Sequence, residues 1–184
     1  MKLSYSIAGK LWWIHNFLDY NMYKGIHDAI IKERKNIHLH SSKGIWQENL
    51  IENIVPPLRT EVSNYKPFER LTTLIKRNPY VQAEEDITKT VTIIHFTPKN
   101  SGINWHNDVK WKYGASFYLN HRWYQNWGGE FMFNDNNGHG WLPPLGNSLV
   151  IVKTPLMHKV NPVLSPTLPR ISLQVFMRSS INPY

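Results

Sequence analysis

Apolar residues in the first half of the chain recur at helical spacing in two segments, each bounded by residues that start or stop helices. The first segment follows Asp19, a good N-cap residue, and its stripe consists of Met22, Ile26 and Ile30. The second begins at Pro67 and stops at Asn78-Pro79, and its stripe consists of Phe68, Leu71, Leu74 and Ile75. Both stripes predict helices that bury one face. Ile45 to Val62 is expected to be partly helical and interrupted by Pro56-Pro57.

From Thr90 onward the pattern changes to short runs of branched and aromatic residues, separated by Gly, Pro and Asn. The predicted strands are Thr90 to Thr97, Tyr113 to Leu119, Gly129 to Asn134, Ser148 to Lys153 and Arg170 to Arg178. Turns are expected at Asn126 to Gly129 and Asn134 to Gly140. This spacing is typical of a sandwich or jelly roll. We therefore predict an α+β fold with a mainly β core at 89–184 and a helix-rich support at 1–88.

Composition narrows the class of protein. A chain of 184 residues that is 41% hydrophobic is long enough for one domain with a substantial core. Cys is absent, so any metal must be held by His and carboxylates. No apolar run approaches the ~20 residues of a membrane helix, and Met1 to Asn16 lacks a small-residue cleavage site. The expectation is a cytoplasmic protein that does not act in a membrane.

The formal charge of +8 suggests either an acidic partner or simply a soluble basic surface. The basic residues are dispersed, and the densest group, Lys32, Arg34 and Lys35, falls on a predicted helix where a solvated face explains it. Aromatic and basic residues alternate at Lys110 to Tyr113 and His121 to Trp127. Such segments suit a substrate-binding rim or a nucleic-acid platform, and composition leaves both open. The oligomeric state cannot be predicted.

One pair of residues carries candidate chemistry. His106 and Asp108 are separated by one residue, so in an extended segment both side chains project to the same side and can bind one ion. A third ligand must come from elsewhere in the chain. Other histidines compete for this role, namely His121, His139 and the pair His38 and His40, but none has a second ligand pattern around it in the sequence. We expect adventitious metal binding at these, and structural roles for His15, His27 and His95.

The segments around this pair resemble a known family. In order, they are Tyr113 to Asn120, Gly128 to Phe133, Leu142 to Val152, Met157 to Val163 and Arg170 to Phe176. Together, over residues 90 to 178, they are similar to the catalytic core of the iron(II)/2-oxoglutarate-dependent oxygenases of the prolyl-4-hydroxylase-like branch. The resemblance implies a double-stranded β-helix and the cofactors Fe(II), 2-oxoglutarate and O2, with ascorbate as a further candidate.

The resemblance also implies a role for individual residues. His106, Asp108 and His158 would hold the iron on one face and leave three positions open. Arg170 would bind the distal carboxylate of 2-oxoglutarate through its guanidinium, with contributions from Tyr118 and Ser172. Phe96 stands where the family often has a Tyr, so that contact is either absent or supplied by a neighbour such as His95. Gly128 and Gly129 are assigned a structural role.

The activity implied is hydroxylation of an unactivated C–H bond, coupled to decarboxylation of 2-oxoglutarate to succinate. The leading substrate is proline in a protein or peptide, because Trp105, Trp111, Trp123, Tyr124 and Trp127 are expected near the mouth of the site. A nucleic-acid demethylase is less favoured, since that branch places a second Arg where this chain has Phe176. A noncatalytic jelly-roll binding module is the third alternative.

Overall fold

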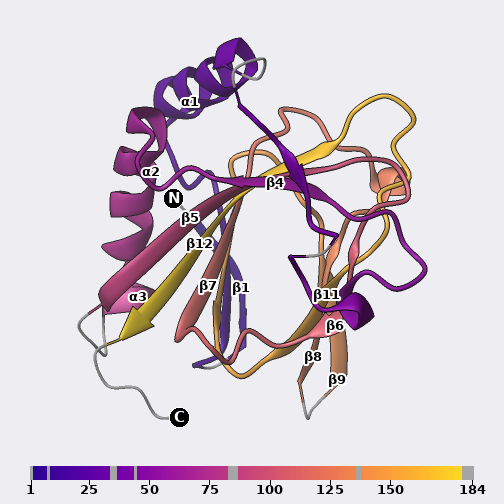
Figure 1. Cartoon of the computed structure of the whole chain (residues 1–184). Coiled ribbons are helices and arrows are strands. Elements are labelled where there is room, and N and C mark those ends of the chain that lie inside the picture. The colour runs from indigo at the N-terminus through magenta and orange to yellow at the C-terminus, as the bar shows by residue number, and fades with distance from the viewer. Residues whose placement is uncertain are drawn as a thin grey trace.

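The computed structural model describes residues 2–7, 9–33, 37–43, 45–82, 87–135 and 138–179. Within them, strands form two antiparallel sheets that face each other, as expected for a jelly roll (Figure 1). The eight-stranded major sheet has the order β1-β2-β10-β7-β12-β5-β4-β3, and the four-stranded minor sheet has the order β6-β11-β8-β9. The predicted fold class is confirmed: the fold is the double-stranded β-helix.

The major sheet combines strands from both halves of the chain. Its strands are β1 (Lys2–Ile7), β2 (Leu11–His15), β3 (His40–Ser41), β4 (Leu58–Glu61), β5 (Ile87–Thr97), β7 (Tyr113–Tyr118), β10 (Leu149–Lys153) and β12 (Arg170–Ser179). The minor sheet consists of β6 (Ile103–His106), β8 (Phe131–Asp135), β9 (Gly138–Leu142) and β11 (Met157–Val160). The five strands predicted from the pattern are all present, with bounds shifted by a few residues.

Two helices cover the outer face of the major sheet (Figure 1). Helix α1 (Tyr20–Glu33) begins after Asp19, whose Oδ1 accepts a 2.9 Å hydrogen bond from the Met22 backbone N–H, so the predicted N-cap is confirmed. Helix α2 (Lys66–Lys76) is followed by the short α3 (Pro79–Gln82). The predicted stripes of both helices belong to one core cluster with the odd-numbered side chains of β12, from Ile171 to Met177. Arg34 and Lys35, part of the predicted basic helix face, lie outside the described residues.

The structure refines the predictions for the irregular segments. Between Ile45 and Val62 the structure has a 3-10 helix, η1 (Glu48–Leu50), and strand β4, which pairs with β5. A second 3-10 helix, η2 (Gln125–Trp127), precedes Gly128. Asn134 to Gly140 belongs to a β8–β9 hairpin in which Asn134 pairs with His139, and residues 136–137, within the predicted turn, lie outside the described residues.

Side chains between the two sheets separate into an apolar end and a polar end. Leu11, Tyr118, Phe131, Phe133, Val150 and Val152 belong to the apolar cluster. The even-numbered residues of β12, which begin with Arg170 and Ser172, point to the same interior because successive side chains of a strand alternate faces. The polar end is therefore lined by rigid strands. Among the described residues, no helix is long and apolar enough to cross a membrane.

Candidate active site

His106 and His158 meet across an antiparallel strand pair. His106 ends β6 and is the direct cross-strand partner of His158 on β11. Their rings lie 4.3 Å apart between centroids, and Phe131 stacks on the other side of the His158 ring at 5.1 Å. The two imidazoles are thereby held by the sheet itself, although many residues separate them in the sequence.

Each imidazole is oriented by a backbone carbonyl two residues earlier. His106 Nδ1 lies 2.7 Å from the carbonyl oxygen of Asn104, and His158 Nδ1 lies 2.9 Å from that of Leu156. Because a carbonyl oxygen only accepts, each Nδ1 donates its proton. Both Nε2 atoms then present a lone pair, as in metal sites where the other ring nitrogen is hydrogen-bonded.

Asp108 brings a carboxylate to both Nε2 atoms. Its Oδ1 lies 3.9 Å from His106 Nε2 and its Oδ2 lies 3.5 Å from His158 Nε2. The turn after Asp108 is fixed by a 2.8 Å hydrogen bond from Trp111 N–H to the Asp108 carbonyl. Gly114 on β7 lies beside the carboxylate, since a Cβ there would be in van der Waals contact with Asp108 Oδ2 at 3.4 Å. The three residues form one of the two clusters of possible metal ligands among the described residues.

Electrostatics keep this cluster in the form that binds cations. Burial raises the pKa of the Asp108 carboxyl, but the neighbouring rings of His158, His106 and His95 outweigh this effect and leave the pKa below its usual value. Burial and the neighbouring His158 lower the pKa of His106, against the opposing effect of Asp108. At neutral pH the cluster therefore consists of a carboxylate facing a neutral His106 imidazole, a donor set that suits a ferrous ion.

A row of polar side chains crosses the major sheet beside this cluster. Arg59 on β4 pairs with His95 on β5, His95 with Ser172 on β12, and Ser172 with Tyr118 on β7. All four residues therefore stand at one level of the sheet, and their spacing is set by backbone pairing. His95 and Ser172 line the same small cavity as the two metal-ligand candidates His106 and His158.

Arg170 lies two residues before Ser172 on β12, so its side chain points to the same face of the sheet. It is almost completely buried. Its Nη1 donates to Ser172 Oγ at 3.4 Å, and its Cζ lies 4.8 Å from the centre of the Tyr118 ring. Neither Arg170 Nε nor the Tyr118 hydroxyl has a hydrogen-bond partner among the described residues. Buried donors without partners are costly, and a carboxylate would satisfy both. The predicted residues Arg170, Tyr118 and Ser172 thus lie together, and their donors could hold an anion; we call this group the socket.

His95 belongs to the site, although the sequence suggested a structural role. Phe96 faces the helices and packs in the outer core, so the side chain that points inward is that of its neighbour, His95. Burial and the charges of Arg59 and Arg170 lower the His95 pKa to about 3, despite the opposing charge of Asp108. Its Nε2 has no hydrogen-bond partner among the described residues. Strand alternation was the signal that could have identified it.

A cleft of about 290 Å³ opens from the His106 and Asp108 side. Its walls include Trp46, Arg59, Trp111, Gln174 and Phe176. Trp111 stacks on Phe176 with 5.5 Å between ring centroids, and Arg178 Cζ lies 5.5 Å from the centre of the Trp111 ring, so both contacts hold the ring at the cleft wall. Sequence reasoning missed Trp46 and Arg59, because the segment that contains them was expected to be partly helical and gave no strand signal.

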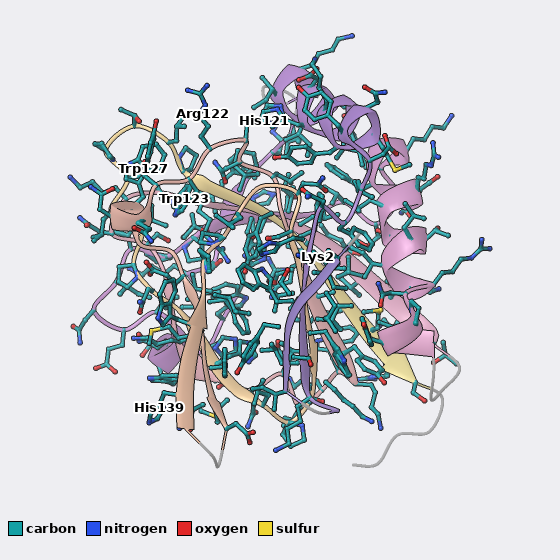
Figure 2. The ribbon with its side chains drawn as sticks, turned by 180° about the vertical axis from the view of Figure 1, so that it is seen from behind. Lys2, His121, Arg122, Trp123, Trp127 and His139 are labelled. Atoms are coloured by element: carbon teal, nitrogen blue, oxygen red, sulfur yellow. The ribbon has the colours of Figure 1, made fainter. Side chains whose placement is uncertain are left out.

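The other aromatic residues expected at the mouth lie elsewhere. Trp123 and Tyr124 line a separate cavity of about 600 Å³ with Trp141, and Trp127 packs edge-on against Trp123 (Figure 2). Trp105 is exposed beside Lys159, at 5.7 Å from its ammonium. Neither Trp123 nor Trp127 is among the residues that line the 290 Å³ cleft. They follow β7, on a segment whose direction the sequence did not reveal.

Gly128 and Gly129 have the predicted structural role. Both have positive φ values, 64° and 72°. A Cβ on Gly129 would lie 3.0 Å from Arg170 Cδ and 3.3 Å from the Trp123 ring. Glycine at this position therefore allows the chain to pass closely over the Arg170 side chain.

Residues 91–178 match the family model of the 2OG-Fe(II) oxygenase superfamily. The chain carries a 2OG-Fe(II) oxygenase domain. The matched segment contains the three proposed metal ligands, His106, Asp108 and His158. It also contains the three socket residues, Arg170, Tyr118 and Ser172. The protein is thus a 2-oxoglutarate-dependent dioxygenase that uses Fe(II), 2-oxoglutarate and O2, and the match favours this interpretation over a noncatalytic binding module.

Solved structures resemble this oxygenase over almost its whole length. A Pseudomonas putida prolyl-4-hydroxylase superimposes with a TM-score of 0.77 at 14% identity, covering 92% of each chain. A Trichoplax adhaerens prolyl hydroxylase in complex with a hypoxia inducible factor peptide fragment gives 0.75 at 15% identity, covering 94% of this chain and 84% of that one. The epimerase SnoN from nogalamycin biosynthesis gives 0.69 at 11% identity, covering 92% and 78%. None of the curated proteins searched matches the sequence.

These likenesses show that the oxygenase has the fold of prolyl-4-hydroxylases, and no more. The same fold is also found in an epimerase, so the reaction and substrate must be argued from the side chains of this site.

Proposed function

We propose that this oxygenase hydroxylates proline in a protein or peptide, with iron held by His106, Asp108 and His158. The single observation that carries the metal assignment is the cross-strand meeting of two imidazoles, each with Nε2 directed to the Asp108 carboxylate. Bound iron, with 2-oxoglutarate and O2, supplies the oxidation of a C–H bond together with decarboxylation to succinate.

Arg170, Tyr118 and Ser172 are proposed to bind the distal carboxylate of 2-oxoglutarate. Arg170 presents a guanidinium from a rigid strand, and Tyr118 adds a buried hydroxyl without another partner among the described residues. Burial raises the Tyr118 pKa, with the charge of Arg170 opposing, so the hydroxyl remains a proton donor at neutral pH. A buried guanidinium without a counterion would be unfavourable, which supports an anion as the natural ligand of this socket.

The cleft walls support a prolyl substrate. Trp111 and Phe176 present stacked rings next to Asp108, and Trp46 lies on the β4 side. Aromatic faces pack well against pyrrolidine rings, and an extended proline-rich segment loses little entropy when it binds. These rings would also exclude water from the carboxylate end of the cleft. A peptide-bound relative among the superimposed structures fits the same proposal.

Arg59 adds a preference for negative charge on the substrate. Burial lowers the pKa of its guanidinium, with Glu61 opposing, and its cation–π contact is with Trp46, at 6.0 Å from the ring centre. An acidic side chain of a bound peptide would gain a charge-assisted hydrogen bond there. We therefore propose a proline-containing peptide with a nearby Asp or Glu.

The experiment compares a proline-containing peptide with the same peptide carrying alanine instead, in the presence of Fe(II) and 2-oxoglutarate. The proposal predicts peptide-stimulated succinate formation and a mass gain of one oxygen on proline, for the first peptide alone. An equal response to both peptides would reject proline as the substrate. A single-stranded oligonucleotide is the third arm: tight binding that falls steeply with salt, with loss of a methyl group, would favour the demethylase alternative.

A further inference from the structure

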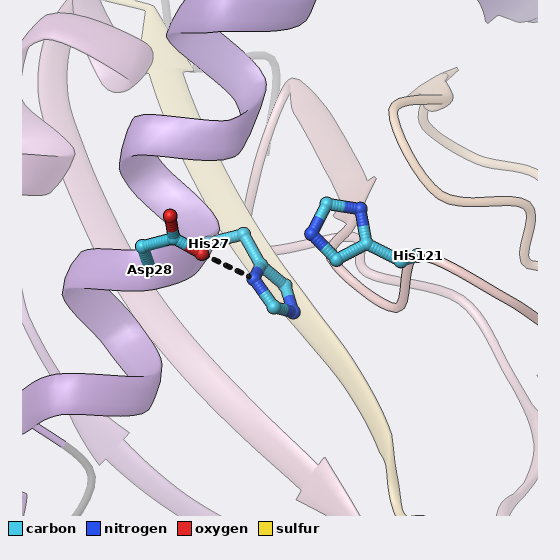
Figure 3. A group of neighbouring side chains, drawn as sticks. All are labelled: His27, Asp28 and His121. Atoms are coloured by element: carbon cyan, nitrogen blue, oxygen red, sulfur yellow. Dashed lines mark hydrogen bonds and ion pairs between the residues drawn. The ribbon is translucent and has the colours of Figure 1, made fainter.

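A second cluster of metal-ligating side chains lies outside the catalytic cleft. Figure 3 shows His27 and Asp28 on α1 and His121 on the segment that follows β7, with the two rings facing each other. Each residue offers one ligand atom, and these atoms all lie within 4.8 Å of one another. The sequence placed no partner near His121, because α1 and residue 121 approach only in the folded chain.

The approach of these two segments is fixed by a buried contact. Tyr23, one helical turn before His27, donates from its hydroxyl to the Leu119 carbonyl at 3.1 Å. Its ring also meets the His121 ring edge-on at 5.0 Å, and the His27 and His121 ring centres are 3.8 Å apart. Tyr23 is 4% exposed, so this anchor is part of the core. The two imidazoles are therefore placed together before any ligand arrives.

Asp28 supplies the negative charge. Its Oδ1 lies 3.2 Å from His27 Nδ1, while its Oδ2 is bound by Lys24 on the same helix. Two ligands of a tetrahedral zinc ion at about 2.0 to 2.1 Å are about 3.3 Å apart, so an ion can replace the proton that His27 and Asp28 share in this hydrogen bond. His121 is exposed and can complete the set by rotation of its side chain.

Protonation and charge also bear on this cluster. Burial and the charges of His27 and Lys24 lower the pKa of His121, against the effect of Asp28, so its ring is neutral at neutral pH. The hydrogen bonds from Lys24 and His27 lower the pKa of Asp28, which keeps the carboxylate ionised. Lys24 works against a bound cation by its charge, which limits the affinity.

We propose that His27, Asp28 and His121 bind a divalent transition-metal ion such as Zn²⁺, separate from the catalytic iron. Imidazole and carboxylate ligands suit this ion, and solvent can complete the coordination because Asp28 and His121 are exposed. The ion joins α1 to the segment that follows β7. This segment continues to Trp123 and Gly129, and Gly129 lies close to the Arg170 side chain.

The test counts zinc ions bound per folded chain, starting from metal-free protein. An Asp108→Ala/His158→Ala variant removes the catalytic cluster, and the proposal predicts that it still binds one zinc ion. Adding His121→Ala should abolish that ion or weaken its binding at least about 10-fold. Adding His139→Ala instead should leave it unchanged, because His139 is exposed on β9, far from His121 (Figure 2).

Two further measurements keep the test decisive. Circular dichroism without metal verifies that each variant is folded. If the His121→Ala variant does not fold, His27→Gln replaces it as the variant that removes a zinc ligand. Zinc should raise the Tm of the double variant and of its His139→Ala derivative, and not that of the His121→Ala derivative. Binding weaker than about 1 mM, or equal binding with and without His121, would overturn the proposal.

Discussion

His106 and His158 are direct partners across the β6–β11 strand pair, with ring centroids 4.3 Å apart. Their separation is therefore set by backbone hydrogen bonds and not by the flexible positioning of two loops. Each ring is further held by a hydrogen bond from Nδ1 to the carbonyl two residues earlier. Such preorganisation means that replacing a ligand should change metal binding without disturbing the sheet.

Replacing Arg170 with Met should separate cosubstrate binding from metal binding. The variant removes the guanidinium opposite the distal carboxylate of 2-oxoglutarate, and loss of one partner of a buried charge pair costs about 2 to 5 kcal/mol. The lower figure corresponds to an affinity loss of about 30-fold. Titration of 2-oxoglutarate into the iron-loaded protein measures this, and iron binding itself should persist.

The matched control for Arg170 is Lys159→Met, since Lys159 lies beside the exposed Trp105 and outside the socket. It should leave the affinity for 2-oxoglutarate unchanged. If Arg170→Met binds 2-oxoglutarate as tightly as the wild type, the carboxylate socket lies elsewhere.

His95 should make the free energy of unfolding depend on pH. Its pKa is lowered to about 3 in the folded chain, so below its ordinary value near 6.5 the unfolded chain binds the additional proton. Stability is therefore complete above about pH 6.5 and falls as the pH drops, with a contribution of about 2 kcal/mol lost by pH 5.

His95→Gln removes this titration and should flatten the pH dependence. Urea unfolding at pH 7 and pH 5 provides the comparison. An identical loss of stability in the variant and the wild type between these two pH values would assign the dependence to other groups.

Arg59→Met should change selectivity among peptides more than the rate of the reaction. A peptide with Asp or Glu near the proline should lose affinity by about 5-fold or more, as expected for a hydrogen bond of about 1 kcal/mol or more to a charged group. A neutral peptide should bind the variant and the wild type alike. Comparison of KM and kcat for the two peptides measures this, and an equal rise in KM for both would refute the role of Arg59.

Much of the site followed from local patterns in the sequence. The one-residue spacing of His106 and Asp108 placed both on one side of an extended segment, and alternation along β12 separated Arg170 and Ser172 from the apolar side chains of the outer core. Both patterns depend on backbone geometry alone, so they hold before tertiary structure is known. The helix after Asp19 followed in the same way from its cap and its apolar spacing.

The remainder depends on contacts between distant segments. Arg59 enters the cleft because β4 pairs with β5, and a four-residue strand after two prolines carries almost no periodic signal. Trp123 and Trp127 lie away from the cleft because the chain turns after β7, which no local pattern specifies. His27 and His121 likewise become neighbours only through the packing of α1.

The central claim is that His106, Asp108 and His158 hold the iron that oxidises 2-oxoglutarate. The most direct measurement is conversion of 2-oxoglutarate to succinate with added Fe(II), by the wild type, by Asp108→Ala and by the control His139→Ala. We expect succinate from the wild type and the control, and none above background from Asp108→Ala, whose thermal unfolding should resemble that of the metal-free wild type. Succinate formation by a folded Asp108→Ala variant at the rate of the wild type would contradict the account.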